Sequence, residues 1–364
     1  MNKVYRIGDY LLQHARENKD LSLMEGKMGI SIFCFIFSRI SNDNKYSEFA
    51  ELLLDDIYKE ISVNHTSDFY HGLAGIGWGI EYLVQNKYIE ADTDEVLEIV
   101  DISTLKALTT NASLHFGLNG YLGYLLYLTQ RLKNSKNLSS VPYKINKELL
   151  IYVINKIDEV CHNHFSQIGT DTSFDLTLDF PVLMIVLERV SQLNLYNVKL
   201  ERMVNQFSPY FETKMPAMNI NKLYLASAVN KLLLRVPNLR LEKQVQKLLF
   251  SIDYNEIKDE VDENNYTIRY GTWGVKYILW QFLVSMPQND LNWKTIVQLY
   301  NSFSYAQDIL PETQEGATNQ TSLKELGLLG GIAGIGFSNL FLPSVIDDLS
   351  YNSMKQPLNL LFNN

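Results

Sequence analysis

The feature that most constrains the fold of this chain is a repeated pair of glycines separated by two residues. Five pairs stand at or just before apolar runs: Gly26/Gly29, Gly72/Gly75, Gly117/Gly120, Gly271/Gly274 and Gly331/Gly334. The first three pairs follow one another at intervals of about 45 residues, a period typical of stacked supersecondary units. The repeat therefore predicts an array of similar units along the chain.

Two further copies of the unit are expected between the third and fourth pairs, because that interval is about three periods long. Apolar runs at 179–187 and 223–234 occupy the expected places, although both have lost the glycines. A more charged segment precedes each apolar run, and its apolar residues follow helical spacing, most clearly at 46–61. The sequence thus predicts an all-α fold of seven helical hairpins.

The two kinds of helix suggest how the hairpins are arranged. A helix that is apolar all round must be buried on every side, whereas a striped helix buries one face. An inner ring of seven apolar helices within an outer ring of seven amphipathic helices satisfies both, so we expect an α/α toroid forming one domain over 1–364. An open solenoid is the alternative, but it needs polar capping repeats, and the last repeat here is the most apolar. The glycines are expected to permit close packing at the helix starts.

Composition narrows the classes of partner and the location. The longest apolar stretch, 28–40, is interrupted by Ser31 and Ser38 and is shorter than the roughly 20 residues that a membrane span needs. Neither a span nor a signal peptide is expected, so the predicted location is the cytoplasm. A net charge of −9 without a basic cluster argues against nucleic acid and leaves room for a cationic peptide partner. Cys34 and Cys161 offer no disulfide framework.

The glycine motifs also resemble those of a known family. Gly-Leu-Ala-Gly-Ile-Gly at 72–77 and Gly-Leu-Leu-Gly-Gly-Ile-Ala-Gly-Ile-Gly at 327–336, together with the seven hairpins, make the whole chain similar to the lanthionine synthetase C (LanC-like) family. The resemblance implies an α/α toroid that adds cysteine thiols to dehydroalanine or dehydrobutyrine, which forms the thioether rings of lanthipeptides. It also implies a peptide substrate, and a dehydratase or another peptide-modifying enzyme as partner.

The zinc site that the resemblance implies has no counterpart in this sequence. In the family, two Cys and one His hold a zinc ion that activates the thiol. The cysteine near the start of the fifth apolar helix is missing from the segment that begins at Asn221. In the Cys-His-Gly before the sixth, Arg269 and Tyr270 precede Gly271. Cys161-His162 contains ligand-type residues but lies in another hairpin, where a solvated helix end is expected. No metal ligand is assigned, and no cofactor is expected.

Several polar residues near the starts of the apolar helices are candidates for a site. His71 directly precedes the second glycine pair, and His115 lies two residues before the third. Parallel inner helices would bring them to one rim, where Asp68, Arg269 and Tyr270 would join them in a pocket. His71, His115 and Tyr270 are candidate general acids or bases, and Asp68 and Arg269 candidate rim residues. The alternative for each histidine is a structural role in its loop.

Carboxylates near the fourth apolar helix form a second group. Asp175, Asp179 and Glu188 could supply the acid pair of a carbohydrate-active toroid. Asp179, which stands before Phe180-Pro181, is better interpreted as the N-cap of a helix with proline in its first turn.

Three functions follow from these observations. The first is a LanC-like protein of lanthipeptide-type maturation, related to the cyclases but working without the usual zinc. The alternative is a non-catalytic subunit that binds the peptide or serves as a scaffold for a partner modification enzyme, because a fold does not guarantee activity. A carbohydrate-active α/α toroid enzyme fits the architecture but does not explain the glycine motifs.

Overall fold

The structure is a computed structural model that describes residues 2–110, 114–133, 135, 137–165, 168–285, 292–303, 326–343 and 346. Its regular elements within these residues are helices, with no strand, as the sequence predicted. They fall into two compact units, comprising Met1–Leu149 with Ala306–Phe341 and Leu150–Tyr305 with Leu342–Asn364. The single domain expected over 1–364 stays a prediction.

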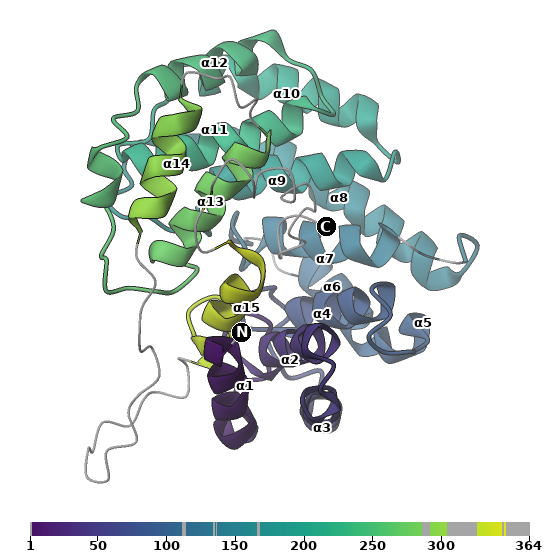
Figure 1. Cartoon of the computed structure of the whole chain (residues 1–364). Helices are drawn as coiled ribbons and strands as arrows, with labels where there is room; N and C mark the ends of the chain where they lie inside the picture. The colour runs from purple at the N-terminus through teal and green to yellow at the C-terminus, as the bar shows by residue number, and fades with distance from the viewer. Residues whose placement is uncertain are drawn as a thin grey trace. The chain divides into compact units, whose positions relative to one another are not determined.

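Figure 1 shows the helices, labelled in the order in which they follow along the chain. Those of unit 1 are α1 (Asn2–His14), η1 (Ala15–Glu17), α2 (Lys27–Ser41), α3 (Asn44–Glu60), α4 (Leu73–Gln85), α5 (Thr93–Val96), α6 (Glu98–Thr110), α7 (Tyr121–Lys133) and α15 (Ile332–Phe341). The boundary between the units falls within α8 (Val141–His164). Those of unit 2 are α9 (Asp179–Gln192), α10 (Asn197–Phe211), α11 (Asn219–Leu233), α12 (Leu239–Phe250), η3 (Glu256–Lys258), α13 (Thr272–Ser285) and α14 (Trp293–Ser302).

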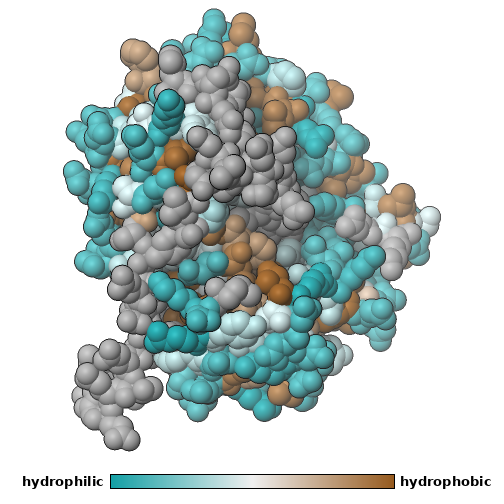
Figure 2. Space-filling view, viewed as in Figure 1, coloured by the Kyte–Doolittle hydropathy of each residue, from teal (hydrophilic) through white to brown (hydrophobic). Residues whose placement is uncertain are grey.

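Burial separates the two kinds of helix as the sequence predicted. In α4 every residue from Leu73 to Leu83 is buried, whereas α3 buries only the stripe Tyr46, Ala50, Leu53 and Ile57. Hydrophilic side chains cover most of the described surface seen in Figure 2, with apolar ones scattered among them. None of the described helices combines the length and the apolar character required to cross a membrane.

Within each unit, neighbouring helices pack along one another. In unit 1, α2 packs against α3, and α4 packs against α7. Helix α15, late in the sequence, packs against α1 and α2, which are early in the sequence (Figure 1). In unit 2, α11 packs against α9, α12 and α13.

Three of the glycine pairs mark the places where a loop folds back onto the first turn of an apolar helix. The N–H of Leu73, the first residue of α4, donates to the carbonyl of Thr66 at 2.8 Å. A Cβ atom at Gly72 would overlap that carbonyl, and one at Gly75 would overlap the carbonyl of Phe69. The same arrangement recurs at α2 with the carbonyl of Asp20 and at α13 with that of Asn265. Both glycines of these three pairs therefore make room for backbone.

The third pair lies three residues later than the sequence analysis placed it. Helix α7 begins at Tyr121, so Gly120 takes the place that Gly72 has before α4. A Cβ at Gly120 would overlap the carbonyl of His115, and one at Gly123 that of Leu118. The structural pair is thus Gly120/Gly123, while Gly117 belongs to the loop. The periodic pattern concealed this because the three glycines are equally spaced.

The fifth pair, Gly331/Gly334, stands at the start of α15. Gly331 directly precedes α15 as expected, and Gly334 is the third residue of that helix. The N–H of Gly334 donates to the carbonyl of Gly327 in the preceding loop at 3.2 Å. Close approach of a neighbouring helix is seen at Gly336, where a Cβ atom would lie 2.7 Å from the ring of Phe33 on α2. The packing role expected of Gly334 stays a prediction.

The second glycine of the other pairs in unit 1 also receives a side chain from a neighbouring loop. A Cβ built at Gly29 would lie 2.8 Å from Cβ of Leu328, and one at Gly75 would lie 3.2 Å from Cβ of Leu23. At Gly123 the corresponding neighbour is Phe69, whose Cβ would be 2.5 Å away. The absence of a side chain at each of these glycines therefore permits two contacts, one with the loop before its own helix and one with the loop of another repeat.

Substitution of Gly75 by alanine is expected to destabilise the protein by about 1–3 kcal/mol, because the backbone of Phe69 cannot move aside without opening the loop. Chemical denaturation measures the loss. Gly330→Ala is the matched control, since its Cβ would meet only the carboxylate of Glu25, at 3.0 Å, and a side chain can rotate away. Equal losses in the two variants would contradict the proposed role of the backbone contact.

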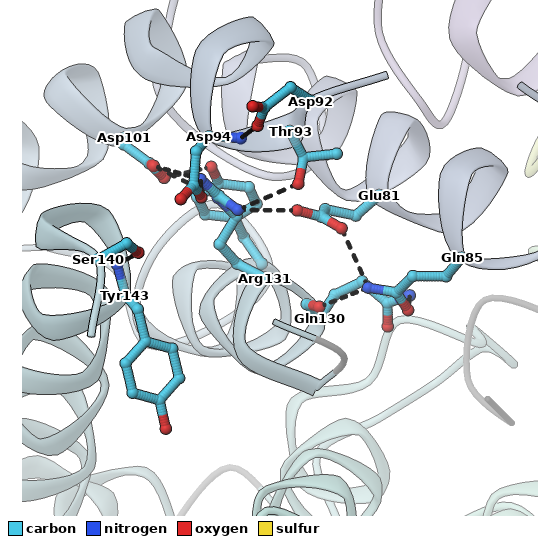
Figure 3. A network of polar contacts seen from close by, with 11 residues as sticks. Glu81, Gln85, Asp92, Thr93, Asp94, Asp101, Gln130, Arg131, Ser140 and Tyr143 are labelled. Atoms are coloured by element: carbon cyan, nitrogen blue, oxygen red, sulfur yellow. Dashed lines mark hydrogen bonds and ion pairs between the residues drawn. The ribbon is translucent and has the colours of Figure 1, made fainter. Parts of the chain in front are cut away.

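A buried ion-pair network joins four helices of unit 1 around Arg131 on α7 (Figure 3). Its guanidinium donates to Glu81 at 3.0 Å, to Asp94 at 2.8 Å and to Asp101 at 3.1 Å. The hydroxyl of Tyr127 also donates to Asp101, at 2.6 Å. The side chains of Arg131 and Glu81 are only 4% and 5% exposed. Burial raises the pKa of Glu81, and the nearby charge of Arg131 opposes this increase. The ionised form of Glu81 is therefore stabilised by Arg131.

Replacement of Arg131 by methionine is expected to cost about 3–5 kcal/mol, because Glu81 would remain buried without a cation. Denaturant titration of Arg131→Met, Glu81→Gln and the double variant forms a cycle in which the double variant recovers part of the loss. Arg16→Met is the exposed control, since its pair with Asp56 leaves the arginine side chain 59% exposed, and it should cost less than about 1 kcal/mol. Strict additivity in the cycle would contradict the coupling.

Candidate functional site

A cavity of about 350 Å³ opens in unit 2 at the N-terminal ends of α9 and α11. Apolar and polar groups share its wall. The lining residues are Ile168, Thr170, Asp171, Asp175, Thr177, Leu178, Asp179, Phe180, Pro181, Pro216, Asn221 and Leu225. A concave site of this kind, with an apolar wall and a few polar groups, is typical of ligand binding.

The loop before α9 carries most of this wall, and contacts with two other helices hold it in place. The N–H of Leu176 donates to the carbonyl of Arg269 at 2.9 Å. The hydroxyl of Tyr224 on α11 donates to the carbonyl of Leu176 at 2.7 Å. The ring of Phe174 packs at Gly274 on α13, where a Cβ atom would lie 2.9 Å from it. The pocket wall is therefore fixed by the loop before α13 as well as by its own helix.

Arg269 makes an ion pair with Asp175 across 94 residues of sequence. Its Nε lies 3.2 Å from Oδ1, and its Nη2 lies 3.1 Å from Oδ2. Asp175 Oδ1 also accepts hydrogen bonds from the N–H and the hydroxyl of Thr177, both at 2.8 Å. The guanidinium carbon of Arg269 lies 4.5 Å from the centre of the Tyr270 ring. Arg269 thus has a defined partner, and Asp175 accepts several hydrogen bonds.

Asn221, on the first turn of α11, is held by the same loop. Its Nδ2 donates to Asp171 Oδ2 at 2.9 Å and to the carbonyl of Ser173 at 3.1 Å. Because both partners are acceptors, the orientation of the amide is determined, and Oδ1 points away from them. Oδ1 is buried and has no hydrogen-bond partner among the described residues. A buried acceptor without a donor costs free energy, so this atom needs an explanation.

Asp179 is the first residue of α9 and does not cap it. The N-cap position is held by Leu178, without a side-chain hydrogen bond, so the predicted N-cap role is wrong. Pro181 does lie in the first turn, as predicted. No hydrogen bond to the Asp179 carboxylate is found among the described residues. Burial raises its pKa, the nearby charge of Asp175 adds to the increase, and His164 opposes it.

Glu188, the third carboxylate of the predicted group, lies one turn before the end of α9. It accepts a hydrogen bond from Gln192 at 2.7 Å and pairs with Arg235 at 3.8 Å. It does not line the cavity. The structure therefore brings Asp175 and Asp179 to the pocket without Glu188.

The remaining predicted site residues belong to unit 1. His71 is exposed, and its N–H donates to Asp68 Oδ1 at 2.8 Å. His115 is exposed as well, and its carbonyl accepts from the N–H of Tyr121 at 2.9 Å. These contacts organise the two loops. The expected meeting of these residues with Arg269 and Tyr270 of unit 2 at one rim stays a prediction.

Both cysteines are poor candidates for a nucleophile. Cys34 lies fully buried in α2, and burial raises the pKa of its thiol strongly. Cys161 is buried near the end of α8, and its pKa is raised to about 11, chiefly by burial. The thiolate is the reactive form, so neither thiol is activated.

The two segments in which the resemblance places zinc ligands, 221–226 and 269–271, contain no cysteine or histidine. Asn221 directs its Nδ2 toward Asp171 and Ser173, and an arginine such as Arg269 has no lone pair to donate to a metal. Among the residues that the structure describes, no group of three or more His, Cys, Asp or Glu is arranged to hold a metal ion.

Comparison with known proteins supports the relation predicted from the glycine motifs. Residues 17–170 match the model of the family described as lanthionine synthetase C-like protein. No curated protein matches the chain. Among solved structures, nisin cyclase is similar, with a TM-score of 0.58, 13% sequence identity and 93% of each chain covered.

The match supports the relation to the LanC-like family over residues 17–170. The similarity to nisin cyclase, an α/α toroid, confirms the predicted fold class. The division into seven inner and seven outer helices stays a prediction.

Of the polar pocket residues, the sequence indicated Asp175 and Asp179 as site candidates, but it did not reveal the contacts that join the pocket residues. Asp171 was not singled out, and the pair between Arg269 and Asp175 was not foreseen. One feature of the sequence could have indicated Asp171 as part of the same group. Aspartates stand at every fourth residue, 171, 175 and 179, up to the start of an apolar helix. A long-range ion pair leaves no such local pattern.

Replacement of Asp179 by asparagine is expected to stabilise the protein at neutral pH. Because the pKa of Asp179 is raised in the folded state, ionisation of the carboxylate favours unfolding as pH rises above its ordinary value. The difference in unfolding free energy between Asp179→Asn and the unmodified protein should therefore grow from acid toward neutral pH. Urea titrations between about pH 4 and pH 7 measure it, with the exposed Asp55→Asn as control. A difference independent of pH would contradict the burial of this charge.

Proposed function

We propose that this protein takes part in the maturation of a ribosomally made peptide of the lanthipeptide type, and that the unit 2 pocket binds the peptide without zinc. The observation that carries the proposal is the occupation of the two zinc-ligand places. Asn221 there is bonded to Asp171, and Arg269 is paired with Asp175. The peptide substrate is inferred from the relation to the LanC-like family. The side chains that line the pocket suit the binding of a peptide.

The acidic lining of this pocket suits binding of a peptide better than catalysis of thioether formation. The reaction needs a thiolate, and a pocket lined by Asp171, Asp175 and Asp179 disfavours a second negative charge. Arg269 is already paired with Asp175, and the described lining contains no lysine, arginine or histidine. A thiol entering this pocket would therefore have a raised pKa. This favours a peptide-binding subunit that works beside a dehydratase or another modification enzyme.

The test uses the purified full-length protein and a synthetic peptide containing one cysteine and one dehydroalanine. Calorimetry measures binding, mass spectrometry follows thioether formation, and elemental analysis measures the zinc content. We expect saturable binding that EDTA does not change and far less than one zinc per chain. Ring formation should be no faster than in the peptide alone. The same peptide with serine in place of cysteine is the control, and it should bind equally well.

Two outcomes would contradict the proposal in different ways. Stoichiometric zinc together with faster ring formation would make the protein a zinc-dependent cyclase. Faster ring formation by the zinc-free protein would establish the cyclase alternative. Absence of binding by both peptides would remove the peptide role itself.

A further inference from the structure

The pocket in unit 2 has an uneven balance of charge. Three of its lining residues are aspartates, and its described lining includes no lysine, arginine or histidine. The nearby cation of Arg269 pairs with Asp175. Asp171 and Asp179 have no matching cation in the described wall, although the charge of His164 outside the lining acts on Asp179. A ligand that brings a positive charge would supply one.

The hydrogen bonds of these two aspartates support the same conclusion. Asp171 accepts only neutral donors among the described residues, namely the N–H of Gly169 at 3.2 Å and Nδ2 of Asn221 at 2.9 Å. Asp179 accepts no hydrogen bond from the described part of the chain, although it is only partly exposed. Buried carboxylates are normally paired or fully hydrogen-bonded. Asp179 therefore has acceptor capacity that the described residues do not use.

Asn221 provides an observation that does not depend on the acidic groups. It lines the cavity and is 1% exposed, and its Oδ1 lacks a donor among the described residues. Since Nδ2 is fixed by two acceptors, rotation of the amide cannot relieve Oδ1. The unsatisfied groups on this wall are therefore acceptors, and the missing partner is a hydrogen-bond donor.

The apolar part of the wall fits the rest of such a ligand. Phe180 and Pro181 begin α9, Leu225 lies on α11, and Ile168 and Pro216 complete the surface. The methylene groups of a lysine or arginine pack readily on apolar surface while the charged head reaches a polar partner. A neutral apolar side chain would leave the acceptors unsatisfied, and an acidic one would be repelled.

On the basis of the proposed function, we propose that this pocket receives a basic side chain, lysine or arginine, of the bound peptide. The cationic head lies at the carboxylates of Asp179 and Asp171 and donates toward Asn221 Oδ1. The aliphatic stem packs against Phe180 and Leu225. The net charge of −9 on the whole chain favours the approach of such a peptide.

Three glycine pentapeptides, capped at both ends and carrying a central lysine, norleucine or glutamate, test the charge preference. Ligand-observed NMR at low salt compares their affinities for the full-length protein. The lysine peptide should bind at least about tenfold more tightly than the norleucine peptide, and the glutamate peptide should bind more weakly than both. Asp179→Asn should lower the lysine affinity about tenfold, while Asp55→Asn on the surface of α3 should not change it.

The variant also separates recognition from folding. Asp179→Asn is expected to be more stable than the unmodified protein at neutral pH, so a loss of affinity cannot be attributed to unfolding. Equal binding of the lysine and norleucine peptides would overturn the charge recognition and leave the peptide role standing. An unchanged lysine affinity in Asp179→Asn would overturn the assignment of this pocket. Absence of binding by all three would overturn the inference, and the dehydroalanine peptide would then show whether the proposed function fails with it.

Discussion

The contact on which the apolar helices depend is the one between a loop carbonyl and the first turn of the helix that follows. It recurs before α2, α4, α7 and α13, where glycines leave room for the backbone to approach. The contact satisfies N–H groups that a helix start would otherwise leave without partners. It also lets an apolar helix begin inside the protein, where water cannot supply the missing acceptors. The rest of each repeat can then be apolar.

At the two apolar helix starts that lack glycine, α9 and α11, polar side chains organise the preceding loop or the helix start itself. At α11 the carboxylate of Glu260 accepts from the N–H groups of Asn219 and Ile220, at 2.7 and 2.9 Å. Before α9 the carboxylate of Asp175 fixes the turn through Thr177. Side chains occupy more space than a carbonyl pressed against glycine and leave a less regular surface. The cavity of unit 2 lies at these two helix starts, so loss of the glycines and gain of a pocket occur together.

The sequence was sufficient for the parts of the fold that depend on local pattern. Burial of α4 on all sides and of α3 along one stripe follows from their apolar spacing, as does the helix at 179–192 without glycine. The site was harder, because its contacts join distant segments. Arg269 could be recognised as a departure from the family motif, but its partner Asp175 could not. Asp179 was misjudged because proline in a first turn suggested a cap one residue too late.

The pair between Arg269 and Asp175 gives the departure from the family motif a physical meaning. A metal ligand at this place would contribute a lone pair, whereas arginine contributes a fixed positive charge and five donors. That charge is matched by Asp175, which also holds the loop wall through Thr177. Asp171 and Asp179 line the cavity. Asn221 lines it as well, and its buried Oδ1 has no hydrogen-bond donor among the described residues. These side chains therefore suit the proposed binding of a cation carried by the ligand better than the binding of a metal ion.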